Sequence, residues 1–462
     1  MVQIRDTKSH KPLDGIVVGD IGPKYGYASM DNGYMLFNNF RIPHSAMLSR
    51  YSRVDPESGK YTKPENSAVV YGSLTAVRAA IVMHARLVLA RAVTVAIRYT
   101  AVRRQFRSRD GKDEGPELAV LDYPTVQIRL LPLLATSFAL HYTGEAMRNL
   151  YERTRQDIEG GDFSKLAEMH SASSGLKSLC TDLAANGIEQ CRRAMGGHGF
   201  GGGSGLIQLN SDYLSKPTVE GDNWMITQQT ASYLLKQMTA ATKQGQPKED
   251  ALLTQYRGYL SQKSKLQPLP VFESDDGIVE AFQRRAMHMA YNAYHARVVE
   301  KKEWNSLLIQ LHKLSHAHSQ SLLVINFHSA LSNSSLSPDL KAVMHLLFRL
   351  FAFYTMDLHA REFGAANAVS DQNLDSLPSK VQALMAQLRP HAVSLVDSWA
   401  IPDFLLDSAL GRYDGRVYED LFNRAHRLNP LNEVTFNPYP HEDEIVKGQG
   451  RSGELEKILA KL

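Results

Sequence analysis

The hydrophobic and polar positions of this 462-residue chain follow two patterns, one before and one after about residue 66. Up to about Met47, short alternating runs such as GIVVGDIG and YMLFNNFRIP are separated by Gly, Asp and Asn, as is typical of strands and turns. Residues 51–66 are polar and are interpreted as a linker. Beyond them, apolar residues recur at helical spacing over much longer stretches. The pattern therefore predicts a small β part followed by a mainly α part.

Four long helices are predicted in the first half of the α part, at about 68–104, 123–152, 163–195 and 223–236. Pro124 suits the first turn of the second helix. The joins are short or rich in glycine, which favours an antiparallel bundle. The most apolar stretch, AAIVMHARLVLARAVTVAI at residues 79–97, contains one histidine and two arginines. We therefore interpret it as a buried core helix and not as a membrane span.

Two polar stretches, QGQPKED and QKSKLQPLP, lie between residues 244 and 270 and are interpreted as an interdomain linker. After them, helical periodicity returns at 278–328, 339–361 and 379–399. The predicted organisation is a partial β domain at 1–50, a helical bundle at 64–245 and a C-terminal helical domain at 265–462.

Composition narrows the function. Hydrophobic residues make up 43% and charged residues 22% of the chain, which is ordinary for a soluble globular protein. A net charge of +4 permits a basic patch for an anionic ligand but lacks the density of a nucleic-acid surface, so a phosphate-bearing small molecule is favoured over nucleic acid. The only two cysteines, Cys180 and Cys191, suit a reducing compartment and are expected to pack as small apolar side chains.

The stretch KPTVEGDN contains a candidate catalytic carboxylate. Glu220 stands directly before Gly221, with Asp222 one residue further on. A glutamate on a helix surface usually only interacts with water, but one at a glycine-kinked junction can be aimed into a cavity. The residues alone leave both interpretations open.

Two further motifs suit a ligand that contains phosphate. AVRRQF, at residues 101–106, could pair with a pyrophosphate and surround an adenine, although arginines also gather at helix C-termini because of the helix dipole. CRRAMGGHGFGGGSG, at residues 191–205, could bring backbone amides close to phosphate oxygens, or could be a flexible turn between helices. No predicted strand precedes it, which excludes a Rossmann phosphate loop.

Other patterns carry less information. His312, His316 and His318 include an i, i+4 pair, but the glutamate of HExxH and a nearby cysteine are missing, so we predict no metal site. The absence of G-x-S-x-G, Walker and CxxC patterns removes the common hydrolase, nucleotidase and thiol-redox functions. The chain ends in AKL, residues 460–462, which is a variant of the S-K-L peroxisomal address but can also arise by chance.

Five segments in order resemble the peroxisomal acyl-CoA oxidases, which are FAD enzymes of the acyl-CoA dehydrogenase superfamily. The segments are GDIGPKYGYASMDNGYMLFNNFRIP, AIRYTAVRRQF, CRRAMGGHGF, TVEGDN and LLDSALGRYDGRVYEDLF. The resemblance implies a mainly α fold: a four-helix bundle of acyl-CoA dehydrogenase type and a second C-terminal all-helical domain, preceded by a remnant of a β-barrel domain. It also implies oxidation of acyl-CoA to trans-2-enoyl-CoA, with dioxygen reduced to hydrogen peroxide, as the first step of peroxisomal fatty acid β-oxidation.

The resemblance assigns roles to particular residues. Glu220 is expected to be the catalytic base, and Asp222 and Asn223 are expected to line the flavin. Arg78 is expected near the thioester and CoA end of the substrate site. Residues implied to contact the FAD of a partner subunit in a homodimer are Arg103, Gln105 and Phe106, together with Gly196 and Gly197 near its ADP part.

The resemblance also has departures. The family normally begins with a helical domain and the first half of the barrel, whereas this chain starts partway through that barrel. We therefore expect Met1 to be an internal position of a longer protein, and the chain alone to dimerise but to bind FAD weakly and show little activity. Pro124 stands where the family tends to have a polar residue.

Two alternatives to an oxidase stay open. One is a noncatalytic or fragmentary family member that acts as a dimerising partner. The other is an acyl-CoA dehydrogenase that passes electrons to a flavoprotein, which peroxide formation would distinguish. The partners expected for the oxidase are acyl-CoA, dioxygen, a second copy of the chain and the peroxisomal import receptor that reads AKL.

Overall fold

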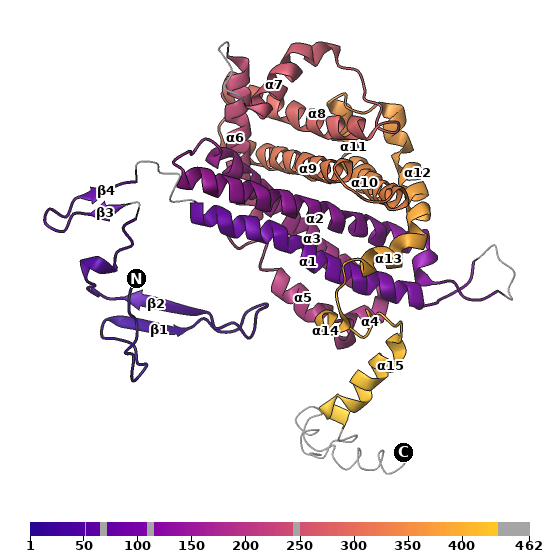
Figure 1. Ribbon diagram of the computed structural model, residues 1–462, viewed down its shortest axis with the longest axis horizontal. Helices are drawn as coiled ribbons and strands as arrows, with labels where there is room; N and C mark the ends of the chain where they lie inside the picture. The colour runs from indigo at the N-terminus through magenta and orange to yellow at the C-terminus, as the bar shows by residue number, and fades with distance from the viewer. Residues whose placement is uncertain (51, 65–71, 109–114, 244–249, 433–462) are drawn as a thin grey trace, which may run out of the picture.

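The computed structural model describes residues 1–50, 52–64, 72–108, 115–243 and 250–432 (Figure 1). In these residues, two layers of helices form most of the protein, and strands occur only in the first 62 residues. The predicted fold class, mainly α with a small β part in front, is confirmed.

The first layer is a bundle of four long helices: α1 (Gly72–Val102), α2 (Pro124–Glu159), α3 (Leu166–Ala194) and α6 (Asn223–Thr242). α1 packs along both α2 and α3, and α3 packs on α6. All four helices were predicted, and Pro124 begins α2 as expected. α1 is long and apolar enough to cross a membrane, but 67% of its most apolar window is buried inside the protein, as expected for a core helix. Cys180 and Cys191 are free, buried thiols on α3, as predicted.

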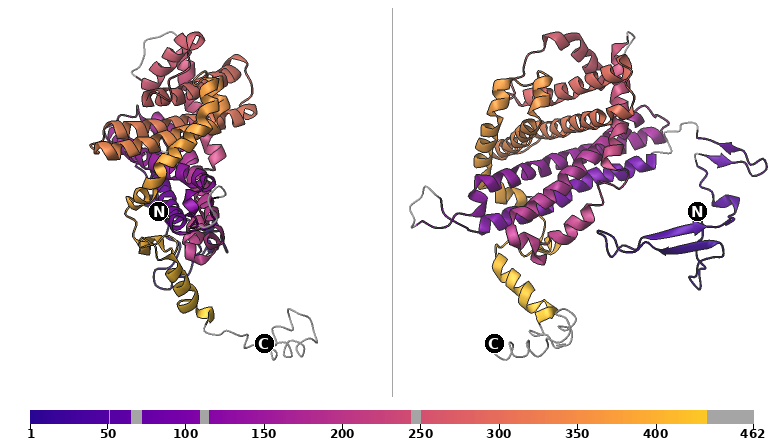
Figure 2. Two further views of the ribbon diagram at one scale, coloured as in Figure 1. Left: turned by 90° about the vertical axis from the view of Figure 1, so that its right-hand side faces the viewer. Right: turned by 180° about the vertical axis from the view of Figure 1, so that it is seen from behind.

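The second layer consists of α7 (Ala251–Gln262), α8 (Asp275–Tyr294), α9 (Leu308–Ser332), α10 (Pro338–Leu358), α11 (Ala360–Ala365), α12 (Asp371–Leu388) and α13 (Ala392–Asp397). α9 packs on α2, α3 and α6, and α10 packs on α2. Both views in Figure 2 show the orange helices of this layer above the purple bundle.

Two expectations for this layer are wrong. The predicted linker contains α7, whose Leu253, Tyr256 and Tyr259 are buried and whose first turn is capped by the Asp250 carboxylate. The helix predicted at 278–328 is broken between α8 and α9, because the chain turns at Lys301 with a positive φ of 56°. No glycine or proline marks that break in the sequence.

Four short helices lie below the bundle in Figure 1: α4 (Gly196–Phe200), α5 (Leu206–Tyr213), α14 (Asp403–Leu406) and α15 (Val417–Phe422). α4 and α5 follow directly from α3. Since α14 and α15 come from the end of the described chain, segments some 200 residues apart meet here. Ala409 N, for example, donates to Gly203 O at 2.8 Å.

The β part consists of two antiparallel hairpins, β1 (Ile16–Asp20) with β2 (Gly33–Phe37) and β3 (Arg53–Val54) with β4 (Tyr61–Thr62). The second hairpin lies in the stretch that we expected to be only a linker. All five residues of β2 are exposed, so the β part adds little to the core. Its contact with the helices is made by the loop between β1 and β2, where Tyr27 N donates to the Asp212 carboxylate on α5.

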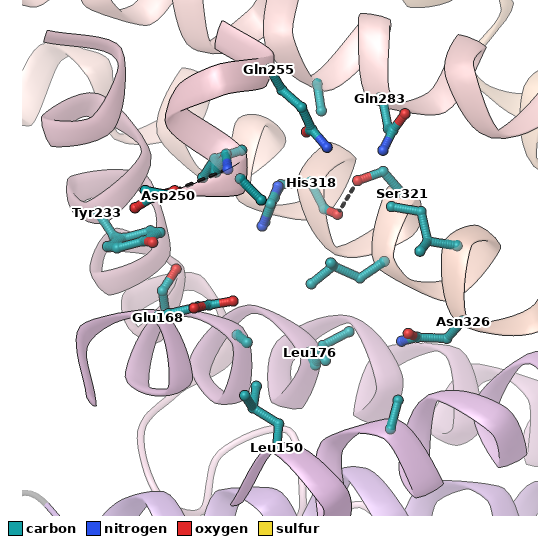
Figure 3. Close-up of a pocket in the computed structure, with 18 of the residues that line it drawn as sticks. Leu150, Glu168, Leu176, Tyr233, Asp250, Gln255, Gln283, His318, Ser321 and Asn326 are labelled. Atoms are coloured by element: carbon teal, nitrogen blue, oxygen red, sulfur yellow. Dashed lines mark hydrogen bonds between the residues drawn. The ribbon is translucent and has the colours of Figure 1, made fainter. Parts of the chain in front are cut away.

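A cavity of about 360 Å³ lies between the two layers and is lined from α2, α3, α6, α7, α8 and α9. Figure 3 shows His318 near its middle, with Glu168, Tyr233 and Asp250 to one side. Burial lowers the pKa of His318 to about 4.

Because of this lowered pKa, His318 makes the free energy of unfolding depend on pH. The unfolded chain binds this proton near pH 6.5 and the folded chain only near pH 4, so stability falls as the pH drops through this window. We expect His318→Gln to reduce the loss of unfolding free energy between pH 7 and pH 5 by up to about 2 kcal/mol. Urea denaturation at pH 7 and pH 5 measures the unfolding free energy of both proteins. An equal loss of unfolding free energy in the wild type and the variant would contradict this prediction.

Candidate active site

Glu220 lies in a sharp turn between α5 and α6. Its φ is +59° and that of Gly221 is +106°, so two consecutive residues have left-handed backbone. For a residue with a Cβ this conformation costs free energy and is kept only where the surroundings enforce it. Glu220 is half-buried. The structure therefore places Glu220 at a break between two helices and not on a helix surface.

Two cations from different helices hold this turn. Lys177 of α3 is fully buried, and its Nζ donates to Gly221 O at 2.7 Å, to Asn223 Oδ1 at 2.9 Å and to Pro217 O at 3.2 Å. Arg78 of α1 donates from Nε and Nη2 to Glu220 O, both at 3.2 Å. The carbonyl groups before, at and after the base are therefore fixed from two sides.

Burial acts on both cations. It lowers the pKa of Lys177 to about 8, against the opposing attraction of Asp182 and Asp222. It also lowers the pKa of Arg78, with the Glu220 charge acting in the other direction. Arg78 Nη1 is buried and makes no hydrogen bond within the described part of the chain. A buried donor without a partner is a position where the acceptor of a ligand would be stabilised.

The two residues after the glycine have different surroundings. Asp222 caps α6 by accepting from Trp224 N at 3.0 Å, and it is exposed. Asn223 is buried, and its amide nitrogen donates to three acceptors on α3, namely Ser178 O, Thr181 Oγ1 and Asp182 Oδ1. Lys177 donates a hydrogen bond to the Asn223 amide oxygen, so both polar atoms of the Asn223 side chain have partners within the chain.

A second cluster lies where α1 ends. Arg103 donates to Gln105 Oε1 at 2.7 Å and to the Tyr418 hydroxyl at 3.1 Å. Phe106 is 70% exposed, with a positive φ of 59°. In α4, a Cβ added to Gly196 or Gly197 would meet no atom within 4 Å. The open surface over this glycine pair and the exposed aromatic ring fit a large ligand such as a dinucleotide.

The two clusters are far apart within one chain. Arg78 and Arg103 are separated by 25 residues along a helix that rises 1.5 Å per residue, which is about 37 Å. Figure 1 shows α1 beginning on the side of the β hairpins and ending on the side of α13. One dinucleotide could not bridge this distance in one chain, so the clusters can share a cofactor only between two copies.

Several residues of these clusters were missed in the sequence. Lys177 has a recognisable signal, because GLKSLC places a lysine on a helix with only small or apolar neighbours. Tyr418 lies in the segment GRYDGRVYEDLF, which supported the resemblance without a role of its own. Tyr99 and His198 join α1 to α4 through a contact of 2.8 Å between the Tyr99 hydroxyl and His198 Nδ1.

Three histidines of α9, namely His312, His316 and His318, lie outside these two clusters. The His312 ring stacks on Trp224 at 3.9 Å between centroids, and His316 Nε2 lies 3.1 Å from the Ser178 hydroxyl. His318 lines the cavity between the layers. Within the described ranges, no group of three His, Cys, Asp or Glu residues is arranged to hold a metal ion.

Two family models match the chain. The model described as acyl-CoA oxidase, C-alpha1 domain, matches residues 71–235, and the model described as acyl-CoA oxidase matches residues 274–444. The first match covers most of the bundle, and the second covers most of the second layer.

Individual relatives match nearly all of the chain. Rat peroxisomal acyl-coenzyme A oxidase 1 is 36% identical over 459 residues, which are 96% of this chain and 68% of the rat protein. The solved structure of Arabidopsis thaliana acyl-CoA oxidase 1 is 36% identical, with a TM-score of 0.88 over 97% of this chain and 69% of that chain. Acyl-CoA oxidase-2 of Caenorhabditis elegans, solved with FAD, ascaroside-CoA and ATP, is 34% identical, with a TM-score of 0.86 over 97% of this chain and 67% of that chain.

Proposed function

This chain belongs to the acyl-CoA oxidase family, and we propose that it oxidises acyl-CoA to trans-2-enoyl-CoA, with FAD as cofactor and dioxygen as the acceptor that becomes hydrogen peroxide. The observation that carries the proposal is the turn that holds Glu220 between Lys177 and Arg78. We further propose that the reaction is the first step of fatty acid β-oxidation. The oxidase model over residues 274–444 favours this function over a dehydrogenase.

Glu220 is suited to remove a proton from the α-carbon of the thioester. A base must be held within hydrogen-bond reach of the proton it takes. The Glu220 backbone is fixed by Arg78, while its carboxylate makes no hydrogen bond or ion pair with the described residues. Its oxygens are therefore available to the substrate, and its position does not have to be organised during the reaction.

We assign Arg78 to the thioester end of the substrate. Two of its nitrogens are used by Glu220 O, and the buried Nη1 is left for a ligand oxygen. One guanidinium would then orient both the base and the substrate. Lys177 supports the turn and does not contact the substrate, because its three hydrogen bonds all end in the turn and none is left for a ligand.

FAD, when bound, accepts the hydride that leaves the β-carbon and passes the electrons to dioxygen. We propose that Asp222 lines the flavin and that Asn223 supports it indirectly, by anchoring the turn. Because the second cluster is about 37 Å from Arg78 along α1, we propose a homodimer in which each copy offers Arg103, Gln105, Phe106, Gly196 and Gly197 to the FAD of the other.

The glycine pair offers a test of cofactor binding that is separate from folding. Since a Cβ at Gly197 would meet no atom of this chain, Gly197→Ala should leave the melting temperature unchanged. If FAD approaches this backbone closely, we expect the variant to bind FAD at least about tenfold more weakly, a loss of about 1.4 kcal/mol. Flavin fluorescence titration measures this, and unchanged affinity would contradict the assignment. Gly161→Ala, at another open glycine, serves only as a folding control, because its φ of +88° predicts a loss of stability without a loss of FAD affinity.

The proposed reaction is tested by adding saturated acyl-CoA esters to the flavin-loaded protein and measuring hydrogen peroxide. Absence of peroxide with every chain length, in a protein that holds FAD, would contradict the proposal. A dehydrogenase would reduce its flavin without forming peroxide at a comparable rate.

We propose a peroxisomal location, because relatives of this chain are named peroxisomal. The AKL sequence at 460–462 lies outside the described residues. If it is the import signal, deleting it should move an N-terminally tagged protein to the cytosol without changing its thermal stability. Fluorescence microscopy of both forms decides this, and retained import would show that another signal or a bound partner is used.

A further inference from the structure

Two histidines of α9 contact the bundle next to the Glu220 turn. Helix α9 packs on both α3 and α6, and Figure 1 shows one end of α9 against α6. The approach to α3 is close, because a Cβ added to Gly175 would lie only 2.6 Å from Ser319 Oγ of α9. Gly175 stands within one helical turn of Ser178, which is the residue that His316 contacts.

His316 reaches the start of α6 through this serine. His316 Nε2 lies 3.1 Å from Ser178 Oγ, and the Ser178 hydroxyl donates to Asn223 O at 3.0 Å. A serine hydroxyl has one proton, and a carbonyl oxygen can only accept. Both contacts are therefore satisfied only if the proton of His316 stands on Nε2 and is donated to Ser178. Ser178 and Asn223 are buried, which makes these hydrogen bonds stronger than exposed ones.

His312 makes the same arrangement one helical turn earlier, with its other nitrogen. His312 Nδ1 lies 3.1 Å from Thr227 Oγ1, and the Thr227 hydroxyl donates to Trp224 O at 2.9 Å. By the same argument, the proton of His312 stands on Nδ1. The His312 ring also stacks on the Trp224 indole, with 10° between the two planes. The two histidines thus act on consecutive carbonyl groups, those of Asn223 and Trp224.

Both rings are neutral at neutral pH. Burial lowers the pKa of His316 to about 3. Burial also lowers the pKa of His312, although the Asp222 charge acts in the other direction. Each ring therefore carries one proton, and its contact with a hydroxyl fixes the nitrogen that holds this proton.

The first of these carbonyl groups belongs to a residue that closes the turn. Asn223 N donates to Pro217 O at 2.9 Å, so the segments before and after Glu220 are joined at Asn223. We propose that His312 and His316 are positioning residues for Glu220. Each donates through a hydroxyl to a backbone carbonyl at the start of α6, and together they fix the end of the turn to the second layer. This inference rests on the proposed function.

The test uses two amides that carry their nitrogen at different places. The side-chain nitrogen of Gln takes the place of histidine Nε2, and that of Asn takes the place of Nδ1. We therefore expect His316→Gln and His312→Asn to keep the wild-type kcat. His316→Asn and His312→Gln should lower kcat about tenfold with little change in KM, because a loosened turn misplaces the base. Peroxide release by the flavin-loaded enzyme gives both constants.

Two further measurements need neither FAD nor turnover. NMR of the protein with ¹⁵N-labelled histidines should show His316 protonated on Nε2 and His312 protonated on Nδ1. Amide hydrogen exchange over residues 214–226 should be faster in His316→Asn and His312→Gln than in the wild type. The matched control at pH 7 is His318→Gln, on the same helix but in the cavity between the layers, and it should change neither kcat nor this exchange.

The proposal is overturned if Gln and Asn at one position give the same kcat and the same exchange, or if either histidine has its proton on the other nitrogen. An equal loss of protection in α2 and α10 would show a general loss of stability and would also overturn it. If the protonated nitrogens and the exchange pattern are as expected but the wild type forms no peroxide, the proposed oxidase function is contradicted, while the role of the two histidines in holding the turn stands.

Discussion

Replacing Glu220 by Gln is expected to lower turnover of the flavin-loaded enzyme by about 10²–10⁴-fold, the range for loss of a well-placed general base. Gln has nearly the same shape but cannot take a proton at neutral pH. Since the carboxylate makes no hydrogen bond or ion pair with the described residues, the substitution should leave the folded structure and its stability unchanged. Peroxide release gives the rate, and acyl-CoA titration gives the affinity, which should stay within a few-fold of the wild type.

Glu273→Gln is a suitable control, because it neutralises an exposed carboxylate away from both clusters. It should leave both the rate and the affinity unchanged. Near-normal peroxide formation by Glu220→Gln would mean that another group is the base.

The second large effect is expected for Lys177→Met. The substitution leaves Pro217 O, Gly221 O and Asn223 Oδ1 without their donor, and losing one partner of a buried hydrogen bond costs about 1–3 kcal/mol. The burial that lowers the pKa of Lys177 to about 8 opposes part of this loss, so we expect a net destabilisation of about 2 kcal/mol. The turn should also loosen, and a misplaced base should lower the rate about 10²-fold.

Amide hydrogen exchange over residues 214–226 separates this positioning role from a general loss of stability. Protection should fall in this turn more than in α2 or α10, and kcat should fall with little change in KM. Lys165→Met, at the start of the same helix, removes only an exposed pair with Glu168 and should cost less than about 1 kcal/mol. Wild-type protection of the turn in Lys177→Met would show that Arg78 and the capping of α6 hold it without the lysine.

The sequence was informative where one local signal determined the structure. The helical spacing of apolar residues located the bundle, and the glycine after Glu220 indicated the break at which the base is held. It failed where tertiary packing decided. Helix α7 was not predicted because the stretches on both sides of it are polar, and its apolar residues are buried only by contacts in the folded protein. The break between α8 and α9 depends on a left-handed Lys301, a residue type that gives no turn signal.

The candidate site shows the same limit. The motif around residue 220 predicted Glu220, Asp222 and Asn223 as one group. Only the fold shows that Asp222 is an exposed helix cap and that Asn223 is buried and anchors the turn. Lys177 lies 43 residues earlier in the chain, and no spacing rule links it to that motif. Likewise, the distance between Arg78 and Arg103 follows from α1 being one unbroken helix, and this distance is the physical reason for expecting a dimer.

Loss of deuterium from the α-carbon of a labelled acyl-CoA, followed without dioxygen in the flavin-loaded enzyme, tests most directly whether Glu220 removes the proton. The wild type should exchange the label with water, because the proton on the Glu220 carboxylate exchanges and can return to the substrate. Glu220→Gln should bind the ester, but the deuterium should leave the α-carbon no faster than it does in water without enzyme. Equal exchange by the wild type and Glu220→Gln would contradict the assignment of Glu220 as the base.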